Sequence, residues 1–170
     1  MIFLNYIIKL SIIFIYFIIT ACKNPSEELI YDYSLIDLNI NSSTYHEFIG
    51  PTAFNNDVTL HYFGHQYWSD CSTLVGKLND LYNDLLSEEI EGVKIIIIGK
   101  EQYSEYNLNW IDNISLPVVV DPIPNNLWEN WDANQWDLYF LDSQANFVKK
   151  INIYEWDYDV VYSSIKALLE

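Results

Sequence analysis

Six residues near the middle of the chain, Val93-Lys94-Ile95-Ile96-Ile97-Ile98, form an almost continuous β-branched run that ends at Gly99. Side chains branched at Cβ favour strands. An apolar run of this length is typical of a parallel strand that is covered on both faces of its sheet. The run therefore favours an α/β arrangement, in which helices cover the sheet, over a two-sheet β-sandwich.

The segment before this run predicts a strand, a turn and a helix. Residues 57–64 read as a strand that ends at Gly64. After Trp68, apolar residues recur at helical spacing and predict one buried stripe. Ser69 or Asp70 is placed to cap the helix by accepting hydrogen bonds from its first free amides. The stripe comprises Cys71, Leu74, Val75, Leu78, Leu81, Tyr82, Leu85 and Leu86.

The remaining elements follow in an alternating order. A tyrosine-rich, helical stretch runs to Ile111, a strand covers 116–121, and a short helix covers 127–131. Strands over 136–141 and 147–153 flank the polar residues 142–146, which predict a hairpin turn. An amphipathic helix over 157–169 ends the chain.

This order predicts the fold class. Parallel strands joined by helices, followed by an antiparallel hairpin, indicate an α/β, thioredoxin-like three-layer sandwich with a central mixed sheet and helices on both faces. The strands at 58–63 and 93–98 should be parallel neighbours, because a right-handed helical crossover joins them.

The N-terminus reads as an export signal. An apolar run starts at Met1, carries one basic residue at Lys9, and ends in Ile19-Thr20-Ala21-Cys22. This ending resembles a bacterial lipobox, in which the cysteine thiol is acylated and the chain is cut just before it. The alternative is a transmembrane anchor, since about 20 apolar residues span a bilayer. A span has no reason to end in Thr-Ala-Cys ahead of a polar linker, which favours lipidation.

These features divide the chain into a lipoprotein signal peptide (1–21), a lipid-anchored tether with an irregular lead-in (22–44), and a thioredoxin-like domain (45–170). We expect an envelope protein on the periplasmic or extracellular face. Lys23 stands where an aspartate would favour retention at the inner membrane, so the outer membrane is the expected location in a cell that has one.

Charge excludes one class of partner. The chain has 24 acidic and 8 basic residues, a net charge of −16, and no arginine. Nucleic-acid binding lacks its basic patch, and an acidic surface repels anionic lipid. The expected partners are therefore membrane lipid, through acylated Cys22, and another envelope protein or a thiol.

Cysteine and histidine usage bounds the chemistry. Of the two cysteines, Cys22 is assigned to lipid, which leaves Cys71 without an intrachain partner in an oxidising compartment. His46 is remote in the lead-in, and His61 alternates within a strand, where a structural role is expected. No metal-ligand spacing is present, so we expect neither a metal nor a cofactor.

One family resemblance covers about residues 45 to 155. The stretches Asp57-Val58-Thr59-Leu60, Tyr62-Phe63-Gly64-His65, Trp68-Ser69-Asp70-Cys71, Lys77-Leu78-Asn79-Asp80-Leu81, Leu116-Pro117-Val118 and Trp128 to Asp142 carry it. They resemble the N-terminal thioredoxin-like domain of selenoprotein P and its bacterial relatives. In that family a selenocysteine or cysteine, three positions before a second cysteine, is the redox nucleophile. Here that position is Trp68.

The resemblance implies a redox ancestry, with Cys71 as the second active-site position. Cys71 lies on the apolar stripe and should point toward the core, and the adjacent Asp70 disfavours a thiolate. A structural role for Cys71 is therefore favoured over a catalytic one. If Cys71 does react, the chemistry is that of a single thiol, forming a mixed disulfide or a sulfenic acid.

Other residues at the expected site have two readings. His65 stands between the strand end and Trp68, where it could pair with a thiolate or shuttle protons, or be an ordinary loop histidine. The resemblance implies that Pro117 is the cis-proline facing the active-site helix. Trp128, Trp131 and Trp136 suggest a ligand platform, but core packing is the favoured reading.

Two functions remain open from the sequence. The first is an envelope protein of thiol-disulfide or peroxide redox ancestry, with little or no catalysis because of Trp68. The second is a binding or assembly module that retains the scaffold without the chemistry.

Overall fold

The computed structural model describes residues 31–123 and 127–170. The expected signal peptide, Cys22 and the start of the tether lie outside the described residues. Within the described part, no helix combines the length and the apolar character needed to cross a membrane.

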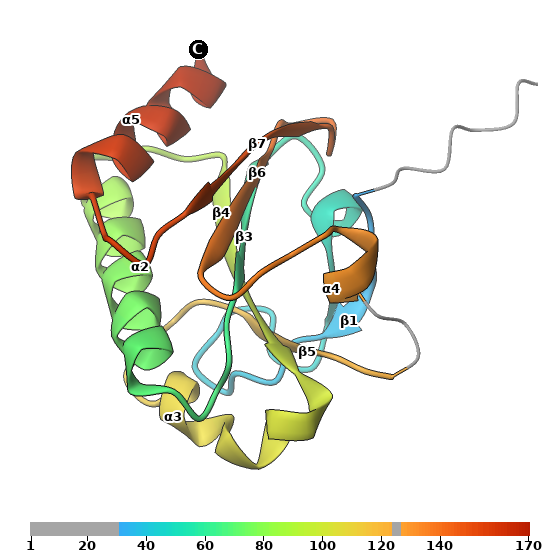
Figure 1. Ribbon diagram of the computed structural model, residues 1–170. Coiled ribbons are helices and arrows are strands. Elements are labelled where there is room, and N and C mark those ends of the chain that lie inside the picture. The colour runs from blue at the N-terminus through green and yellow to red at the C-terminus, as the bar shows by residue number, and fades with distance from the viewer. Residues whose placement is uncertain (1–30, 124–126) are drawn as a thin grey trace, which may run out of the picture.

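A five-stranded mixed sheet forms the centre, in the order β5-β4-β3-β6-β7 (Figure 1). Its strands are β3 (Val58–Phe63), β4 (Val93–Lys100), β5 (Val118–Asp121), β6 (Asp137–Leu141) and β7 (Phe147–Asn152). β3, β4 and β5 run parallel, whereas β6 is antiparallel to both β3 and β7. The expected parallel pairing of the strands at 58–63 and 93–98 is confirmed, with Leu60 opposite Ile95.

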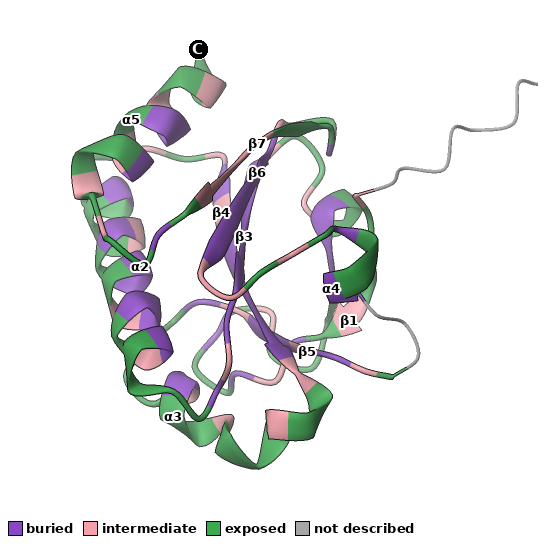
Figure 2. Ribbon diagram, in the orientation of Figure 1, coloured by how far each residue is buried: buried purple, intermediate pink, exposed green. Residues whose placement is uncertain are grey.

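Helices pack on one face of the sheet. They are α2 (Ser69–Ser87), α3 (Leu108–Ile111) and α5 (Tyr158–Leu169), with the 3-10 helix η2 (Glu101–Tyr106) leading into α3. α2 and α5 lie side by side, and the start of α2 lies near α3 (Figure 1). Figure 2 shows the buried side of α2 turned toward the sheet, as its apolar stripe predicts. Leu86 departs from that stripe, because its side chain is 51% exposed.

The opposite face is covered by α4 (Leu127–Asn130), the 3-10 helix η1 (Pro51–Ala53) and a short hairpin of β1 (Leu35–Ile36) with β2 (Phe48–Ile49). Trp128 and Trp131 are 6% and 2% exposed and pack here, which confirms the core interpretation for both. Layers on both faces of the mixed sheet confirm the predicted α/β class.

The lead-in is bonded to the domain. Asp37 is fully buried, and its Oδ1 accepts hydrogen bonds from the backbone amides of Asn39 and Val118. The amide of Leu38 donates to the carbonyl of Val118, and Asn39 Nδ2 donates to the carbonyls of Ile114 and Leu116. Residues 31–44 therefore belong to the same folded unit as the described residues 45–123 and 127–170.

His61 lies in the core, as its alternation within the strand predicts. Its Nδ1 is 2.9 Å from the Tyr33 hydroxyl and its Nε2 is 2.9 Å from Thr59 Oγ1. Complete burial lowers the pKa of His61 from 6.5 to about 3. The imidazole is therefore a neutral structural group that joins the lead-in to β3.

Candidate functional site at the start of α2

The turn between β3 and α2 begins with a glycine that the packing requires. A Cβ atom on Gly64 would lie 2.8 Å from the Tyr62 ring and 3.1 Å from the Trp110 ring. The Gly64 amide donates to the carbonyl of Ile98, and the Trp68 amide donates to that of His65, so the chain turns tightly into α2. The turn thereby places Trp68 at the N-cap of the helix.

The prediction that Ser69 or Asp70 caps the start of α2 is wrong. The helix begins at Ser69, so Ser69 and Asp70 lie inside it, and no side chain caps its N-terminus. Trp68, in an extended conformation, occupies the cap position without an oxygen to offer. The first amides of α2 are therefore free of the side-chain acceptors that the sequence suggested.

Gln66 fixes the turn to the rest of the sheet, and sequence reasoning missed it. Its side chain is fully buried, donates from Nε2 to the Lys100 carbonyl and to Asn107 Oδ1, and accepts from the Lys100 amide. Gly99 makes room for it, since a Cβ there would lie 2.3 Å from Gln66 Nε2. The glycine that ends the β-branched run was the available sequence signal, because it marks a close approach.

Cys71 lies in the first turn of α2 with its side chain fully buried. Its Sγ accepts from the backbone amide of His65 at 3.4 Å and from Gln135 Nε2 at 3.3 Å. Tyr62 is a further neighbour: burial, and next the Cys71 thiol, raise the pKa of Tyr62 well above its ordinary value. The predicted core-facing orientation of Cys71 is therefore what the structure has, although its sulfur also has two N–H donors.

Trp68 covers the start of the helix from outside. Its side chain is 40% exposed and meets the Trp136 ring edge-on, with ring centroids 6.4 Å apart. Tyr67 lies on one side of Trp68, and Tyr154 packs on Trp136 with centroids 4.5 Å apart. We call Tyr67, Trp68, Trp136 and Tyr154 the helix-start aromatic surface.

Trp136 departs from its predicted place in a strand. It has a φ of +70° and precedes β6, which begins at Asp137. Its amide donates to the Phe63 carbonyl and its carbonyl accepts from the Ile153 amide. A left-handed conformation is uncommon for a bulky residue, and these two bonds hold it in the loop opposite α2.

The His65 ring turns away from Cys71. It lies between Tyr103 and Trp128, with ring centroids 4.9 and 5.4 Å away. Burial, and next the positive charge of Lys100, lower the pKa of His65 from 6.5. The structure therefore brings together the His65 backbone and the Cys71 sulfur, but it forms no imidazole–thiol pair.

Pro117 does not face the start of α2, contrary to the expectation drawn from the resemblance. It immediately precedes β5, where its carbonyl accepts from the Ile97 amide, and it lines a pocket with Tyr82 and Leu86 of the second half of α2. Tyr82 lies eleven positions after Cys71, about 16 Å along a helix. The loop that does face Cys71 contains Gln135, which the sequence analysis did not single out, and Trp136, which it considered as a ligand platform or a core residue and not as a neighbour of the thiol.

The chemistry available here is narrow. Across the described ranges, no group of three or more His, Cys, Asp or Glu side chains could hold a metal ion. The nucleophile of the site is one buried thiol, with an indole at the exposed position three residues earlier. Cys71 is the thiol that could attack a disulfide at this site, and Trp68 has to move before a disulfide can reach it.

No protein-family model and no curated protein matches the chain. Solved structures do. Yeast Sco1 matches with a TM-score of 0.66 at 14% identity, covering 85% of this chain and 96% of that one. A putative thiol:disulfide interchange protein DsbE from Chlorobium tepidum matches with a TM-score of 0.65 at 11% identity, covering 82% of this chain and 94% of that one. An SCO1/SenC family lipoprotein from Bacillus anthracis matches with a TM-score of 0.63 at 12% identity, covering 88% of this chain and 100% of that one. These likenesses span nearly the whole of each relative, and they show that the chain has a thioredoxin-like fold.

Proposed function

We propose that this chain is an exported protein, anchored to the cell envelope by a lipid on Cys22, with a thioredoxin-like domain of redox ancestry that catalyses little or no thiol–disulfide exchange. The selenoprotein P-like motifs around Trp68 and Cys71 support a kinship with that family as part of the same proposal. The lipobox pattern supports the anchor, and the fold shared with thiol:disulfide interchange proteins supports the ancestry.

One observation carries the catalytic part of the proposal. Trp68 stands at the exposed start of α2, where the resemblance places the nucleophile, while Cys71 is fully buried beneath that turn. An indole is not a nucleophile toward disulfides, and a thiol must reach its target sulfur in line to exchange with it. The domain therefore has the scaffold of a thiol oxidoreductase without an accessible attacking group.

A single-thiol reaction is the second candidate, and the two N–H donors on Cys71 Sγ favour it. The two donors hold the sulfur in a fixed position between the turn after β3 and the loop before β6. In such a step the Cys71 thiolate attacks one sulfur of a disulfide, forms a mixed disulfide, and releases the other sulfur as a thiolate. The reaction requires an opening of the turn at residues 64–68.

A binding role is the alternative to any redox chemistry, and the exposure of the helix-start aromatic surface favours it. Tyr67, Trp68 and Tyr154 are 46%, 40% and 56% exposed. Aromatic side chains are enriched at sites where proteins bind one another. The expected partner is another envelope protein.

The test compares the wild type with Trp68→Cys and Cys71→Ala. We expect no measurable reduction of insulin by the wild type with dithiothreitol as the electron source. Trp68→Cys should form a disulfide with Cys71 under oxidised glutathione, because the turn supplies the geometry, and should gain reductase activity. Wild-type turnover that Cys71→Ala removes would establish the single-thiol reaction instead. A folded Trp68→Cys variant that never forms the bridge would contradict the proposed ancestry of the site.

A further inference from the structure

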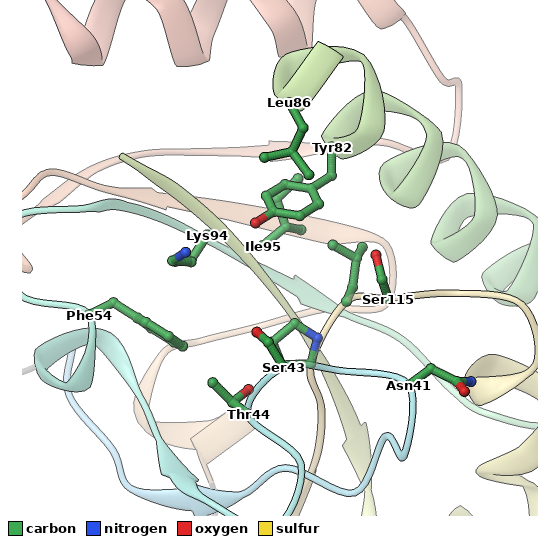
Figure 3. A pocket seen from close by; sticks show the side chains of 11 residues that line it. Asn41, Ser43, Thr44, Phe54, Tyr82, Leu86, Lys94, Ile95 and Ser115 are labelled. Carbon is green, nitrogen blue, oxygen red and sulfur yellow. The ribbon is translucent and has the colours of Figure 1, made fainter. Parts of the chain in front are cut away.

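A pocket of about 290 Å³ lies beside the second half of α2 (Figure 3). Tyr82 and Leu86 reach it from the second half of α2, Lys94 from the beginning of β4, Phe54 from the end of η1, and Thr44 from the lead-in. This volume lies near the lower end of the range of about 300–1,000 Å³ that is usual for small-molecule sites. The pocket therefore suits a small ligand.

One part of the wall is apolar. The side chains of Phe54, Tyr82 and Leu86 face one another across the opening (Figure 3). Leu86 ends the apolar stripe of α2, yet it is 51% exposed, whereas Leu85 beside it is fully buried. The apolar surface of Leu86 is thus available to a ligand in the pocket.

The polar part of the wall includes two donors that point into the same space. Lys94 Nζ and the Tyr82 hydroxyl extend toward the same space (Figure 3). Lys94 Nζ forms a long ion pair with Asp57 Oδ2 at 3.9 Å, with the Lys94 side chain 36% exposed and able to meet a second anion, and within the described ranges Tyr82 Oη has no hydrogen-bond partner. The hydroxyls of Thr44 and Ser115 are already engaged, by Asp37 and Asn79.

The charge of the lining differs from that of the whole chain. The chain has 24 acidic residues against 8 basic ones, yet Lys94 is the charged side chain among the residues that line this pocket, and none of them is acidic. A ligand held here meets an ammonium group and a free phenolic donor beside an apolar wall. This combination selects an anionic acceptor that carries an apolar body.

We propose that this pocket binds a small carboxylate with an aryl or short alkyl body. The carboxylate accepts hydrogen bonds from Lys94 Nζ and Tyr82 Oη, and the apolar body packs on Phe54 and Leu86. The site is separate from Cys71 and Trp68, so it does not depend on any redox activity of the domain.

The test uses the exported, mature protein, held in lipid nanodiscs by its N-terminal anchor at Cys22, with para-fluorophenylacetate as the probe and fluorine NMR as the readout. Empty nanodiscs give the background. The amide analogue, para-fluorophenylacetamide, has the same shape without the charge. We expect saturable binding of the carboxylate, and binding of the amide weaker by about tenfold or more, because hydrogen bonds to a charged group are stronger than those between neutral groups.

Variants assign the binding to the pocket. Lys94→Gln should weaken binding of the carboxylate probe by about tenfold. Lys94→Arg should retain most of the affinity, since a cation remains. Leu86→Trp should block the pocket without changing charge. Lys77→Gln removes a lysine of α2 that lines a different pocket; it is the control for the loss of one positive charge and should bind like the wild type. Thermal unfolding of each variant checks its folding.

The proposal is overturned by the absence of saturable binding, by equal affinity for the carboxylate and the amide, or by a loss of affinity in Lys77→Gln as large as that in Lys94→Gln. Binding that persists in a folded Leu86→Trp variant would place the probe elsewhere and would also overturn it.

Discussion

The side chain of Gln135 donates to the sulfur of Cys71 across 3.3 Å, from a loop 64 residues farther along the chain. Together with the His65 amide, this bond encloses the thiol between the turn after β3 and the loop before β6. The sulfur is thus held by two segments that must separate before any reagent reaches it.

We predict that Cys71 resists alkylation in the folded protein. Iodoacetamide should modify it slower than in guanidinium by about a hundredfold or more, because reaction requires a local opening. Trp68→Ala should speed the modification, since the indole covers the helix start, whereas Tyr67→Ala should change it less. Mass spectrometry after timed quenching measures each rate. Equal rates for folded and unfolded wild type would contradict the enclosure.

The anchor is tested at Cys22. Cys22→Ser should abolish acylation and leave an uncleaved precursor, because a hydroxyl does not replace the thiol in the lipid transfer. Intact mass and partitioning into detergent report both effects, and Cys71→Ser is the matched control that should still be lipidated. Wild-type protein that carries no lipid mass and fractionates with the soluble periplasm would remove the anchor from the proposal.

Gly99→Ala should destabilise the domain by about 1–3 kcal/mol, because the added methyl group overlaps the buried Gln66 side chain. In a Gln66→Ala background the same change should cost clearly less, since the overlapping atoms are gone. Gly76→Ala is the control: a Cβ there meets nothing within 4 Å, so the variant should be as stable as the wild type or more so. Denaturant unfolding measures the stability of Gly99→Ala, Gln66→Ala, the double variant and Gly76→Ala. Additive effects at positions 66 and 99 would show that the two residues are not coupled as described.

His61 should make stability depend on pH. Its folded pKa of about 3 lies below the ordinary 6.5, so the unfolded chain takes up the proton first and stability is lost as pH falls from about 6.5 toward about 3. Between about pH 7.5 and about pH 5 the free energy of unfolding should therefore fall by about 2 kcal/mol.

The matching variant is His61→Gln, which removes the titration and keeps a polar side chain between Tyr33 and Thr59. Its loss of unfolding free energy over the same pH interval should be smaller than that of the wild type by about 2 kcal/mol. His46→Asn, at an exposed position with a φ of +66°, is the control and should keep the wild-type slope. Parallel pH profiles for His61→Gln and the wild type would show that the buried imidazole is not the source.

The sequence predicted the elements well because local periodicity determines them. The strand at 58–63 was placed correctly. The strand β4, predicted from the β-branched run, extends one residue past Gly99, and the last helix begins at Tyr158 with Asp157 as its N-cap. The chain's own hydrophobic pattern suffices for such assignments.

The site was harder, because it depends on strand direction. β5 is parallel to β3, so the loop before β5, with Pro117, lies away from the end of β3 that leads into α2. β6 is antiparallel to β3, so the loop before β6 returns to that end and brings Gln135 to Cys71. Two loops that each precede a strand look alike in sequence, and the sheet decides which of them reaches the thiol.

The burial of the Gln66 side chain could not be predicted from the sequence either. Gln66 lies in a turn where glutamine is expected on the surface, and only the approach of Gly99 from the next strand makes room for its side chain. Such a pairing joins positions that no local pattern relates.

The bonds between Asp37, Leu38 and Val118 have a consequence for association between molecules. β5 is the outermost strand on its side of the sheet, and an open outer strand is a template on which another chain can add. Here the backbone N–H and C=O of Val118 are already taken, the first by the Asp37 carboxylate and the second by the Leu38 amide. The segment that contains Asp37 and Leu38 thus also protects the outer edge of β5 from pairing with a strand of another molecule. Molecules crowded on one surface would need this protection most.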